Sequence, residues 1–257
     1  MVLYICRWIL VSLVVASQSS VTPAVASQGA TFTVENKCQY TVWPGISGNG
    51  ISTTGFELQK GESRTITAPP SWSGQLWGRT RCAVNSSTGN FNCVTGDCGS
   101  GMVSCFGFKP APPTTFLELR LEESNENGAL DYFYVNVADG YNLPLLVVPQ
   151  GDTGANCSMA GCVMDLNGFC PTELRLSDGR GEVVACKGPC LTLQQEKYCC
   201  TERSTCRPTL YSRVFKDACP HAHIYPYDHA SVIIPRQTSQ LLGQVMKESL
   251  ASKMAHY

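Results

Sequence analysis

Three cysteines and one aspartate lie within thirteen residues, Cys93 to Cys105, in the stretch CVTGDCGSGMVSC. Thiols and a carboxylate at such short spacing can either bind zinc or, for the thiols alone, close disulfides. A zinc site of this kind takes paired C-x2-4-C knuckles and a fourth ligand, and the spacings here do not repeat that pattern. The residues therefore favour disulfides, and we predict no metal site and no cofactor.

The N-terminus indicates the compartment in which these cysteines are found. Arg7 precedes an apolar run from Trp8 to Ala16, and a polar stretch then ends in the small residues Ala24 to Ala26. The run is too short to cross a bilayer, which takes about 20 residues. We predict a secretory signal peptide over residues 1–26, in preference to a buried N-terminal helix. We expect no integral membrane segment and an extracellular (apoplast) or vacuolar location.

Composition agrees with export to an oxidising compartment. Of 15 cysteines, Cys6 is removed with the signal, and the other fourteen favour disulfides. Charged residues are 15% of the chain, where about 25% is usual, while Gly, Pro and Cys are plentiful, so a loop-rich and strand-rich fold is expected. With a net charge of -1, the protein lacks the positive surface potential that attracts nucleic acids or anionic membranes. We therefore expect the binding partner to be a neutral polymer or another protein.

Two segments alternate as strands that expose one face of a sheet. One face of residues 116–121 carries leucines, and Glu118 points away from it. In residues 131–137, Phe133 and Val135 are expected to point inward, and Tyr134 outward. Asp139 and the glycine after it then turn the chain. The outward faces of the two strands can form one surface.

The segment from Cys157 to Cys219 has a different character. Cysteines and turn residues crowd it, and only PCLTLQQEKYCC is typical of a short helix. Such a segment cannot bury a large core by itself. We expect a separate lobe held together by several disulfides, each of which stabilises the fold by about 2 to 4 kcal/mol.

A resemblance to a known family rests on a series of motifs. GNFNCVTGDCGSGMVSC from Gly89 to Cys105 resembles the signature of the thaumatin-like proteins, a plant pathogenesis-related group. LWGRTRC precedes it, and VADGYNLP, CPTEL, VVACKGPC, YCC and CRPTLYSRVFKDACPHA follow in the family's order. These motifs run from about Ala30 to Ser231, which is nearly all of the chain after the signal.

The resemblance implies a mainly β fold with three lobes within residues 27–231. A β-sandwich is expected over residues 27–80, 114–163 and 220–231, a small lobe over residues 81–113, and a disulfide-rich lobe over residues 164–219. The resemblance also implies six disulfides and leaves Cys38 and Cys157 without partners. The implied pairs are Cys82 with Cys93, Cys98 with Cys105, Cys162 with Cys219, Cys170 with Cys186, Cys190 with Cys199, and Cys200 with Cys206.

A cleft between the sandwich and the disulfide-rich lobe is also implied, and in this family it is credited with binding β-1,3-glucan. Members line it with one arginine, one glutamate and three aspartates. By motif, the arginine is Arg79, the glutamate is Glu118, and two of the aspartates are Asp139 and Asp228. The third aspartate position falls on Tyr134, which departs from the family.

These side chains have a chemistry of their own. Two carboxyl groups that flank a glycosidic bond can act as general acid and as base or nucleophile. Glu118 is our candidate acid and Asp139 its partner, which would give at most a weak endo-β-1,3-glucanase. A tyrosine at position 134 removes one negative charge and adds a stacking face, so the sequence favours sugar binding over hydrolysis.

Several residues have a simpler structural interpretation. Arg79 and Asp228 can form a salt bridge across the lobes. Trp43, Trp72 and Trp77 can stack on sugars, although buried sandwich tryptophans are commoner. His221 and His223 lack a third ligand for a metal. Asn85 in NSS is our predicted glycosylation site, whereas Asn156 is next to a cysteine that the scaffold should hold.

The C-terminus departs from the family after about Ser231. The family's last two half-cystines and terminal strands have no counterpart in residues 232–257. In this divergent tail, apolar residues fall at helical spacing, namely Leu241, Leu242, Val245, Met246 and Leu250. The spacing predicts a helix. Either the terminal strands have been replaced, or the tail is a genuine divergence that caps an open edge of the sandwich.

Together these observations predict a secreted, monomeric defence protein that binds the β-1,3-glucan of fungal cell walls. The main alternative is a protein-binding module, such as an inhibitor of an enzyme that a pathogen secretes, in which the cleft carboxylates would have no role. Antifungal action by membrane leakage is a third hypothesis, and the low net charge favours it least.

Overall fold

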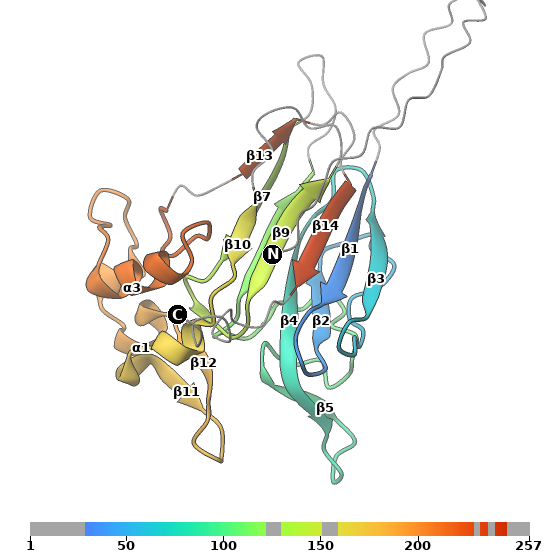
Figure 1. The fold of residues 1–257 in the computed structure, drawn as a ribbon, viewed down its shortest axis with the longest axis horizontal. Helices are drawn as coiled ribbons and strands as arrows, with labels where there is room; N and C mark the ends of the chain where they lie inside the picture. Colours follow the sequence, from blue (N-terminus) through green and yellow to red (C-terminus); the bar gives the residue numbers. More distant parts are fainter. Residues whose placement is uncertain (1–28, 122–129, 151–158, 229–231, 236–239, 246–257) are drawn as a thin grey trace, which may run out of the picture.

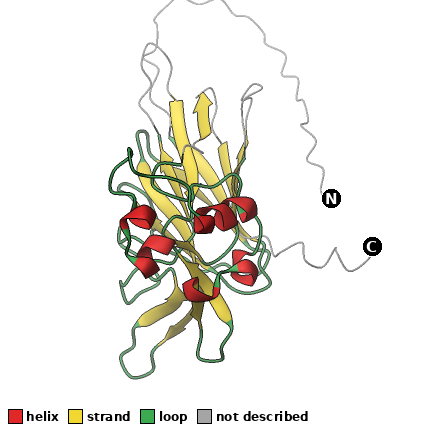
Figure 2. Cartoon of the chain, turned by 90° about the vertical axis from the view of Figure 1, so that its left-hand side faces the viewer, coloured by secondary structure: helices red, strands yellow, loops and turns green. Residues whose placement is uncertain are grey.

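A computed structural model describes residues 29–121, 130–150, 159–228, 232–235 and 240–245. Two β-sheets pack face to face, and a lobe that carries the helices lies beside them (Figure 1). Figure 2 shows these helices gathered on one side of the strands. No helix in the described part of the chain is long and apolar enough to cross a membrane. The predicted signal peptide, residues 1–26, lies outside the described residues.

The first sheet has five strands in the order β10-β9-β14-β1-β3. In that order their bounds are Ala160–Cys162, Leu145–Gln150, Gln240–Val245, Ala30–Asn36 and Ser63–Ala68. β1 alternates between buried and partly buried residues because every second side chain points to the core. The mainly β architecture agrees with the fold that the sequence predicts.

The second sheet follows the order β13-β7-β6-β4-β2, and β5 pairs with β4. The bounds of these six strands are Val232–Pro235, Leu130–Asn136, Phe116–Arg120, Ser73–Val84, Trp43–Ser47 and Phe91–Thr95. Leu117, Leu119, Phe133 and Val135 are buried in the core between the two sheets. This burial confirms the inward faces that alternation predicts and leaves Glu118 and Tyr134 on the opposite face.

The prediction of a helical tail without terminal strands is wrong. Residues 240–245 form β14, which pairs in parallel with β1 and antiparallel with β9. Residues 232–235 form β13, which extends the second sheet beside β7. A strand between β1 and β9 satisfies the backbone groups of both neighbours, which a helix at the same place would leave exposed. Both residue ranges of the tail that are described are therefore strands of the sandwich.

The third unit is the disulfide-rich lobe. It contains a small sheet of β8 (Gly140–Tyr141), β11 (Arg175–Ser177) and β12 (Val183–Lys187). Two 3-10 helices, Leu166–Phe169 and Thr172–Leu174, and three α-helices complete it, namely α1 (Pro189–Leu193), α2 (Glu196–Cys199) and α3 (Leu210–Ala218). Thr209 and Ser212 form a capping box that starts α3.

Six disulfides connect this framework, and they are the same six pairs that the family resemblance implies. Cys82 and Cys93 join β4 to β5, and Cys162 joins β10 to Cys219 after α3. Cys38 is buried in the core of the sandwich. Cys157 lies outside the described residues.

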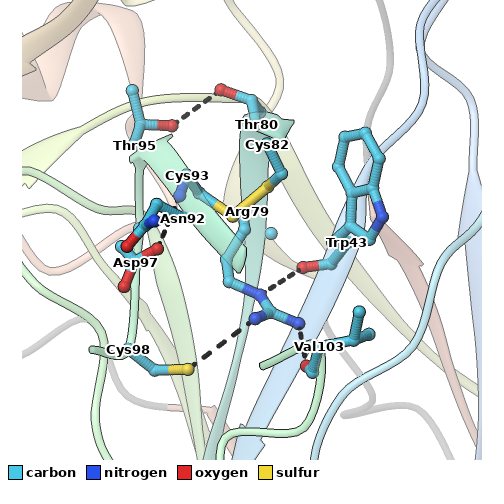
Figure 3. The surroundings of a disulfide bond; sticks show 12 residues. Trp43, Arg79, Thr80, Cys82, Asn92, Cys93, Thr95, Asp97, Cys98 and Val103 are labelled. Carbon is cyan, nitrogen blue, oxygen red and sulfur yellow. Dashed lines mark hydrogen bonds between the residues drawn. A yellow bond between two sulfur atoms is a disulfide. The ribbon is translucent and has the colours of Figure 1, made fainter. Parts of the chain in front are cut away.

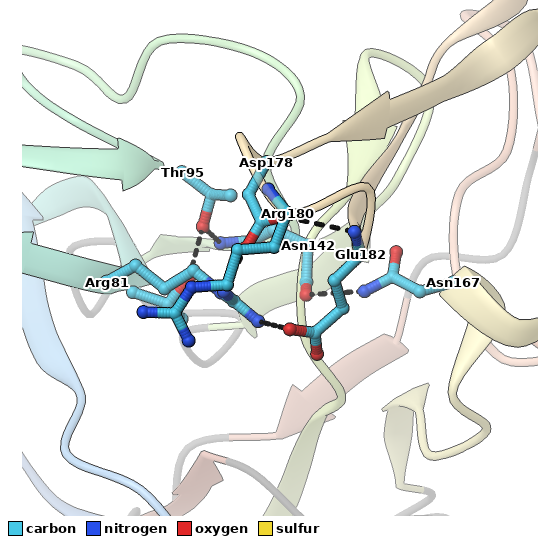
Figure 4. A network of polar contacts seen from close by, with 8 residues as sticks. Arg81, Thr95, Asn142, Asn167, Asp178, Arg180 and Glu182 are labelled. Atoms are coloured by element: carbon cyan, nitrogen blue, oxygen red, sulfur yellow. Dashed lines mark hydrogen bonds and ion pairs between the residues drawn. The ribbon is translucent and has the colours of Figure 1, made fainter.

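An ion-pair cluster joins β4 to the hairpin of β11 and β12. Nη1 of Arg81 lies 2.6 Å from Oδ2 of Asp178, and Nη2 lies 2.6 Å from Oε2 of Glu182 (Figure 4). Arg81 is far in sequence from the two hairpin residues, and its guanidinium group forms two separate contacts with the hairpin. The cluster therefore holds β4 against the β11–β12 hairpin.

Candidate functional site

Four polar and aromatic side chains lie next to one another on the outer face of the second sheet. Gln75 of β4 is opposite Glu118 of β6, which is opposite Tyr134 of β7. The ring of His223 stacks on Tyr134. All four residues are partly buried. We call Gln75, Glu118, Tyr134 and His223 the polar row.

Glu118 is the centre of the polar row because it accepts hydrogen bonds from both sides. Nε2 of Gln75 donates to Oε2 of Glu118 over 3.2 Å. The Tyr134 hydroxyl also hydrogen-bonds to the Glu118 carboxylate. Burial, followed by the charge and the hydrogen bond of Glu118, raises the pKa of Tyr134 to about 12. Tyr134 is therefore a neutral donor at all physiological pH values.

His223 reaches Tyr134 because its segment runs in parallel beside the end of β7. Its backbone N–H donates to the Val135 carbonyl over 2.7 Å, and its carbonyl accepts from the Val137 N–H over 2.9 Å. The two ring centroids lie 4.2 Å apart with 14° between the planes. The strand thus holds the imidazole flat against the phenol, so that the two rings form one aromatic platform.

Asp139 lies in different surroundings from Glu118. It follows β7 and lines a cavity of about 80 Å³ in the disulfide-rich lobe, together with residues of α1 and α2. The residue is exposed, yet the protein packed around its carboxyl group raises the pKa by desolvation. Glu118 interacts with Gln75 and Tyr134, whereas Asp139 belongs to this cavity.

Asp228 is held within its own lobe. Its Oδ2 lies 2.8 Å from Nζ of Lys216 in α3 and also accepts the Ile224 N–H over 3.2 Å. Only 12% of the side chain is exposed. These contacts shape the loop that follows His223. Asp228 therefore supports the position of the polar row without belonging to it.

Arg79 is fully buried beneath the small lobe, with 0% exposure. Figure 3 shows its guanidinium group pointing to backbone oxygens and to the sulfur of Cys98. It donates to the carbonyls of Trp43 over 3.0 Å and Pro44 over 3.3 Å, and also to that of Val103. Burial lowers its pKa to about 10, and the nearby Asp97 opposes that change. Without exposed surface, Arg79 cannot contact a sugar.

The tryptophans divide between the core and the surface. Trp72 and Trp77 are buried, whereas Trp43 is partly exposed and its indole N–H donates to Glu57 over 3.3 Å. Asn85 is exposed at the turn between β4 and β5. Its side-chain oxygen accepts the N–H of Ser87 and Thr88, which fixes the turn.

Sequence reasoning missed two members of the polar row, Gln75 and His223. Gln75 is two residues before Trp77 in a strand, and alternation places both on the same face. This alternation can be read from the sequence, whereas the motif WGRT indicates only Arg79. His223 had no comparable signal, because its approach to Tyr134 depends on the pairing of a loop with β7.

The chain is similar in sequence to known proteins. The sequence matches the model of the Thaumatin family over residues 36–241, a range that contains the polar row, all six disulfides and the beginning of β14. It is 46% identical over 213 residues to thaumatin-like protein 1 of Prunus persica, which covers 80% of this chain and 85% of that protein.

Two further matches differ in extent. The chain is 47% identical over 209 residues to the PR5-like receptor kinase of Arabidopsis thaliana, which covers 77% of this chain and only 31% of the kinase. The solved structure of the thaumatin-like xylanase inhibitor TLXI aligns with 84% of this chain and 99% of that chain, at 20% identity and a TM-score of 0.48. The receptor kinase is thus about three times as long as the part that matches.

Proposed function

The chain belongs to the thaumatin family, and on that premise we propose that it is a secreted, monomeric defence protein whose polar row binds the β-1,3-glucan of fungal cell walls. The observation that carries the proposal is the arrangement of Glu118 between Gln75 and Tyr134, with His223 stacked on Tyr134. Sugars are bound by hydrogen bonds to their hydroxyl groups and by aromatic rings against their apolar faces. The polar row offers both kinds of contact in one place.

We propose binding without efficient hydrolysis. The Gln75 amide and the Tyr134 hydroxyl both donate to Glu118, so hydrogen bonds from two neighbours hold the carboxyl group in place. Hydrolysis needs two carboxyl groups that flank one glycosidic bond. Asp139, the other carboxyl candidate, lines the cavity of the disulfide-rich lobe. The arrangement favours a carboxylate that accepts hydrogen bonds from sugar hydroxyls.

The test is retention on insoluble β-1,3-glucan of the wild-type protein and of Glu118→Gln. The substitution keeps the shape of the side chain but replaces one accepting carboxylate oxygen by an NH2 group, which can only donate. We therefore expect clearly weaker retention of this variant on the glucan. Asp217→Asn is the matched control, because Asp217 is an exposed carboxylate of α3 outside the polar row. Equal retention of all three proteins would overturn the proposed site.

The same proteins test the alternatives. Incubation with a soluble β-1,3-glucan is expected to release no new reducing ends, and release that disappears in Glu118→Gln would establish a glucanase. If no variant is retained on glucan while the wild-type protein inhibits an enzyme secreted by a fungus, the protein-binding alternative replaces our proposal. Growth assays on a fungus then show whether glucan binding is accompanied by antifungal activity.

A further inference from the structure

We propose that the cavity of the disulfide-rich lobe binds the carboxylate group of an acidic sugar, such as a uronate residue of a cell-wall polysaccharide. The cavity has a volume of about 80 Å³ and lies between α1, α2, the start of α3 and residues 224–226. Two of its lining residues, Lys197 and Arg207, are cationic, and one, Asp139, is acidic. We call it the cationic cavity.

The two cations are free to bind an anion. Nζ of Lys197 lies 4.7 Å from the centroid of the Tyr198 ring, and Nη1 of Arg207 donates to the Cys206 carbonyl over 3.0 Å. Among the described residues, neither has a carboxylate partner. A guanidinium group has five N–H donors in a planar fork, so Arg207 retains donors for the two oxygens of a carboxylate.

Disulfides hold the backbone that carries both cations. Cys190 and Cys199 connect α1 to α2, and Cys200 and Cys206 close the loop that leads to Arg207. Lys197 is therefore in a helix whose end is tied at Cys199, and Arg207 directly follows a tied cysteine. A preorganised site loses less conformational entropy when a ligand binds. This rigidity distinguishes the cavity from an ordinary group of surface cations.

The size and walls of the cavity indicate how a sugar would bind. A volume of about 80 Å³ holds a carboxylate and a few neighbouring atoms, since one water in the liquid takes about 30 Å³. Tyr198 and Tyr225 are part of the lining and offer aromatic surface for a sugar ring. The carboxylate would therefore enter while the ring lies across the opening.

The cavity and the polar row are adjacent along the chain. His223 belongs to the row, and the next residues along the chain, Ile224, Tyr225 and Pro226, line the cavity. A polysaccharide that lies on the row can thus present a substituent to the cavity. The inference rests on the proposed function because it takes a sugar as the ligand. It adds a preference for a sugar residue that carries a carboxylate, which neutral glucan lacks.

The experiment is calorimetric titration of the full secreted protein with three probes, an oligogalacturonate, a neutral β-1,3-gluco-oligosaccharide of equal length, and inorganic phosphate. Wild type is compared with Arg207→Gln and Lys197→Gln. We expect each substitution to weaken oligogalacturonate binding at least about tenfold, because a charge-assisted hydrogen bond is lost, and to leave neutral oligosaccharide binding unchanged. Arg213→Gln, an exposed cation of α3 outside the cavity, is the matched control and should bind like wild type.

The outcomes separate this inference from the proposed function. Oligogalacturonate binding that depends on Arg207, without any neutral oligosaccharide binding, would support the cavity and overturn the glucan proposal. Neutral binding with no effect of Arg207→Gln or Lys197→Gln on oligogalacturonate would overturn the cavity alone. Equal losses in Arg213→Gln, or binding of phosphate as tight as that of oligogalacturonate, would mean that the protein responds only to general anionic charge, which also overturns the inference.

Discussion

The imidazole of His223 lies flat on the phenol of Tyr134, with ring centroids 4.2 Å apart. The two residues are 89 positions apart in the sequence, and a backbone pairing between the His223 segment and β7 brings them together. The stack places an aromatic platform beside the Glu118 carboxylate, at a position where the family resemblance implies an aspartate. An additional carboxylate is thus replaced by a neutral aromatic surface.

Removal of the Tyr134 ring should weaken glucan binding. Tyr134→Ala deletes one half of the aromatic platform, and aromatic contacts of this kind contribute about 0.5 to 1.5 kcal/mol. We expect about two- to tenfold weaker affinity for a β-1,3-gluco-oligosaccharide by calorimetry. Tyr134→Phe removes the hydrogen bond to Glu118 but keeps the ring. Because the ring remains, this variant should retain most of the affinity. A larger loss in Tyr134→Phe than in Tyr134→Ala would contradict a stacking role.

Replacement of Arg79 should lower stability rather than sugar affinity. Arg79→Met leaves buried carbonyls without donors, and each buried unsatisfied group costs about 1 to 3 kcal/mol. We expect the free energy of unfolding to fall by about 3 to 4 kcal/mol in urea denaturation. Glucan affinity per folded molecule should stay at the wild-type value. Normal stability combined with lost affinity would place the guanidinium group at the sugar.

Asp139 should make stability depend on pH. Desolvation raises its pKa above the usual value of 3.8 in the folded state, so the folded protein binds the proton more tightly than the unfolded chain. Its contribution to stability is complete at low pH and is lost as the pH rises through the folded-state pKa. Asp139→Asn should prevent this loss of stability, because the asparagine side chain stays uncharged as the pH rises.

Thermal unfolding of wild type and Asp139→Asn at pH 3 and pH 7 checks the sign of this effect. The melting temperature of Asp139→Asn relative to wild type should be higher at pH 7 than at pH 3. A difference that is the same at both values, or that decreases toward pH 7, would contradict desolvation of the carboxyl group as the cause of the raised pKa.

Truncation of the tail should show that β14 is part of the sandwich. A chain that ends after Pro235 lacks the strand between β1 and β9, and both strands then have an unpaired edge. We expect this variant to be secreted poorly or to aggregate. A chain that ends after Val245 keeps all the described strands and should be secreted with six disulfides, as mapped in non-reducing peptides by mass spectrometry. Equal secretion of both variants would contradict the central position of β14.

The sequence by itself determined the local features of this protein. Alternation predicted the buried faces of residues 116–121 and 131–137, because a strand directs successive side chains to opposite sides whatever its neighbours are. The order and spacing of the cysteines predicted the fold family, and the resemblance implied the six pairs that the structure contains. These features depend on short-range backbone geometry or on the spacing of cysteines within the sequence motifs.

Only the tertiary structure decided which residues meet. The register of β4 and β6 places Gln75 beside Glu118, and the small lobe covers Arg79 although its motif suggested an exposed cleft residue. The apolar residues of the tail fit a helix by spacing, yet residues 240–245 form a strand because the gap between β1 and β9 provides hydrogen-bond partners on both sides. Pairing across strands and burial by a distant segment are long-range effects, and local patterns of residues do not contain them.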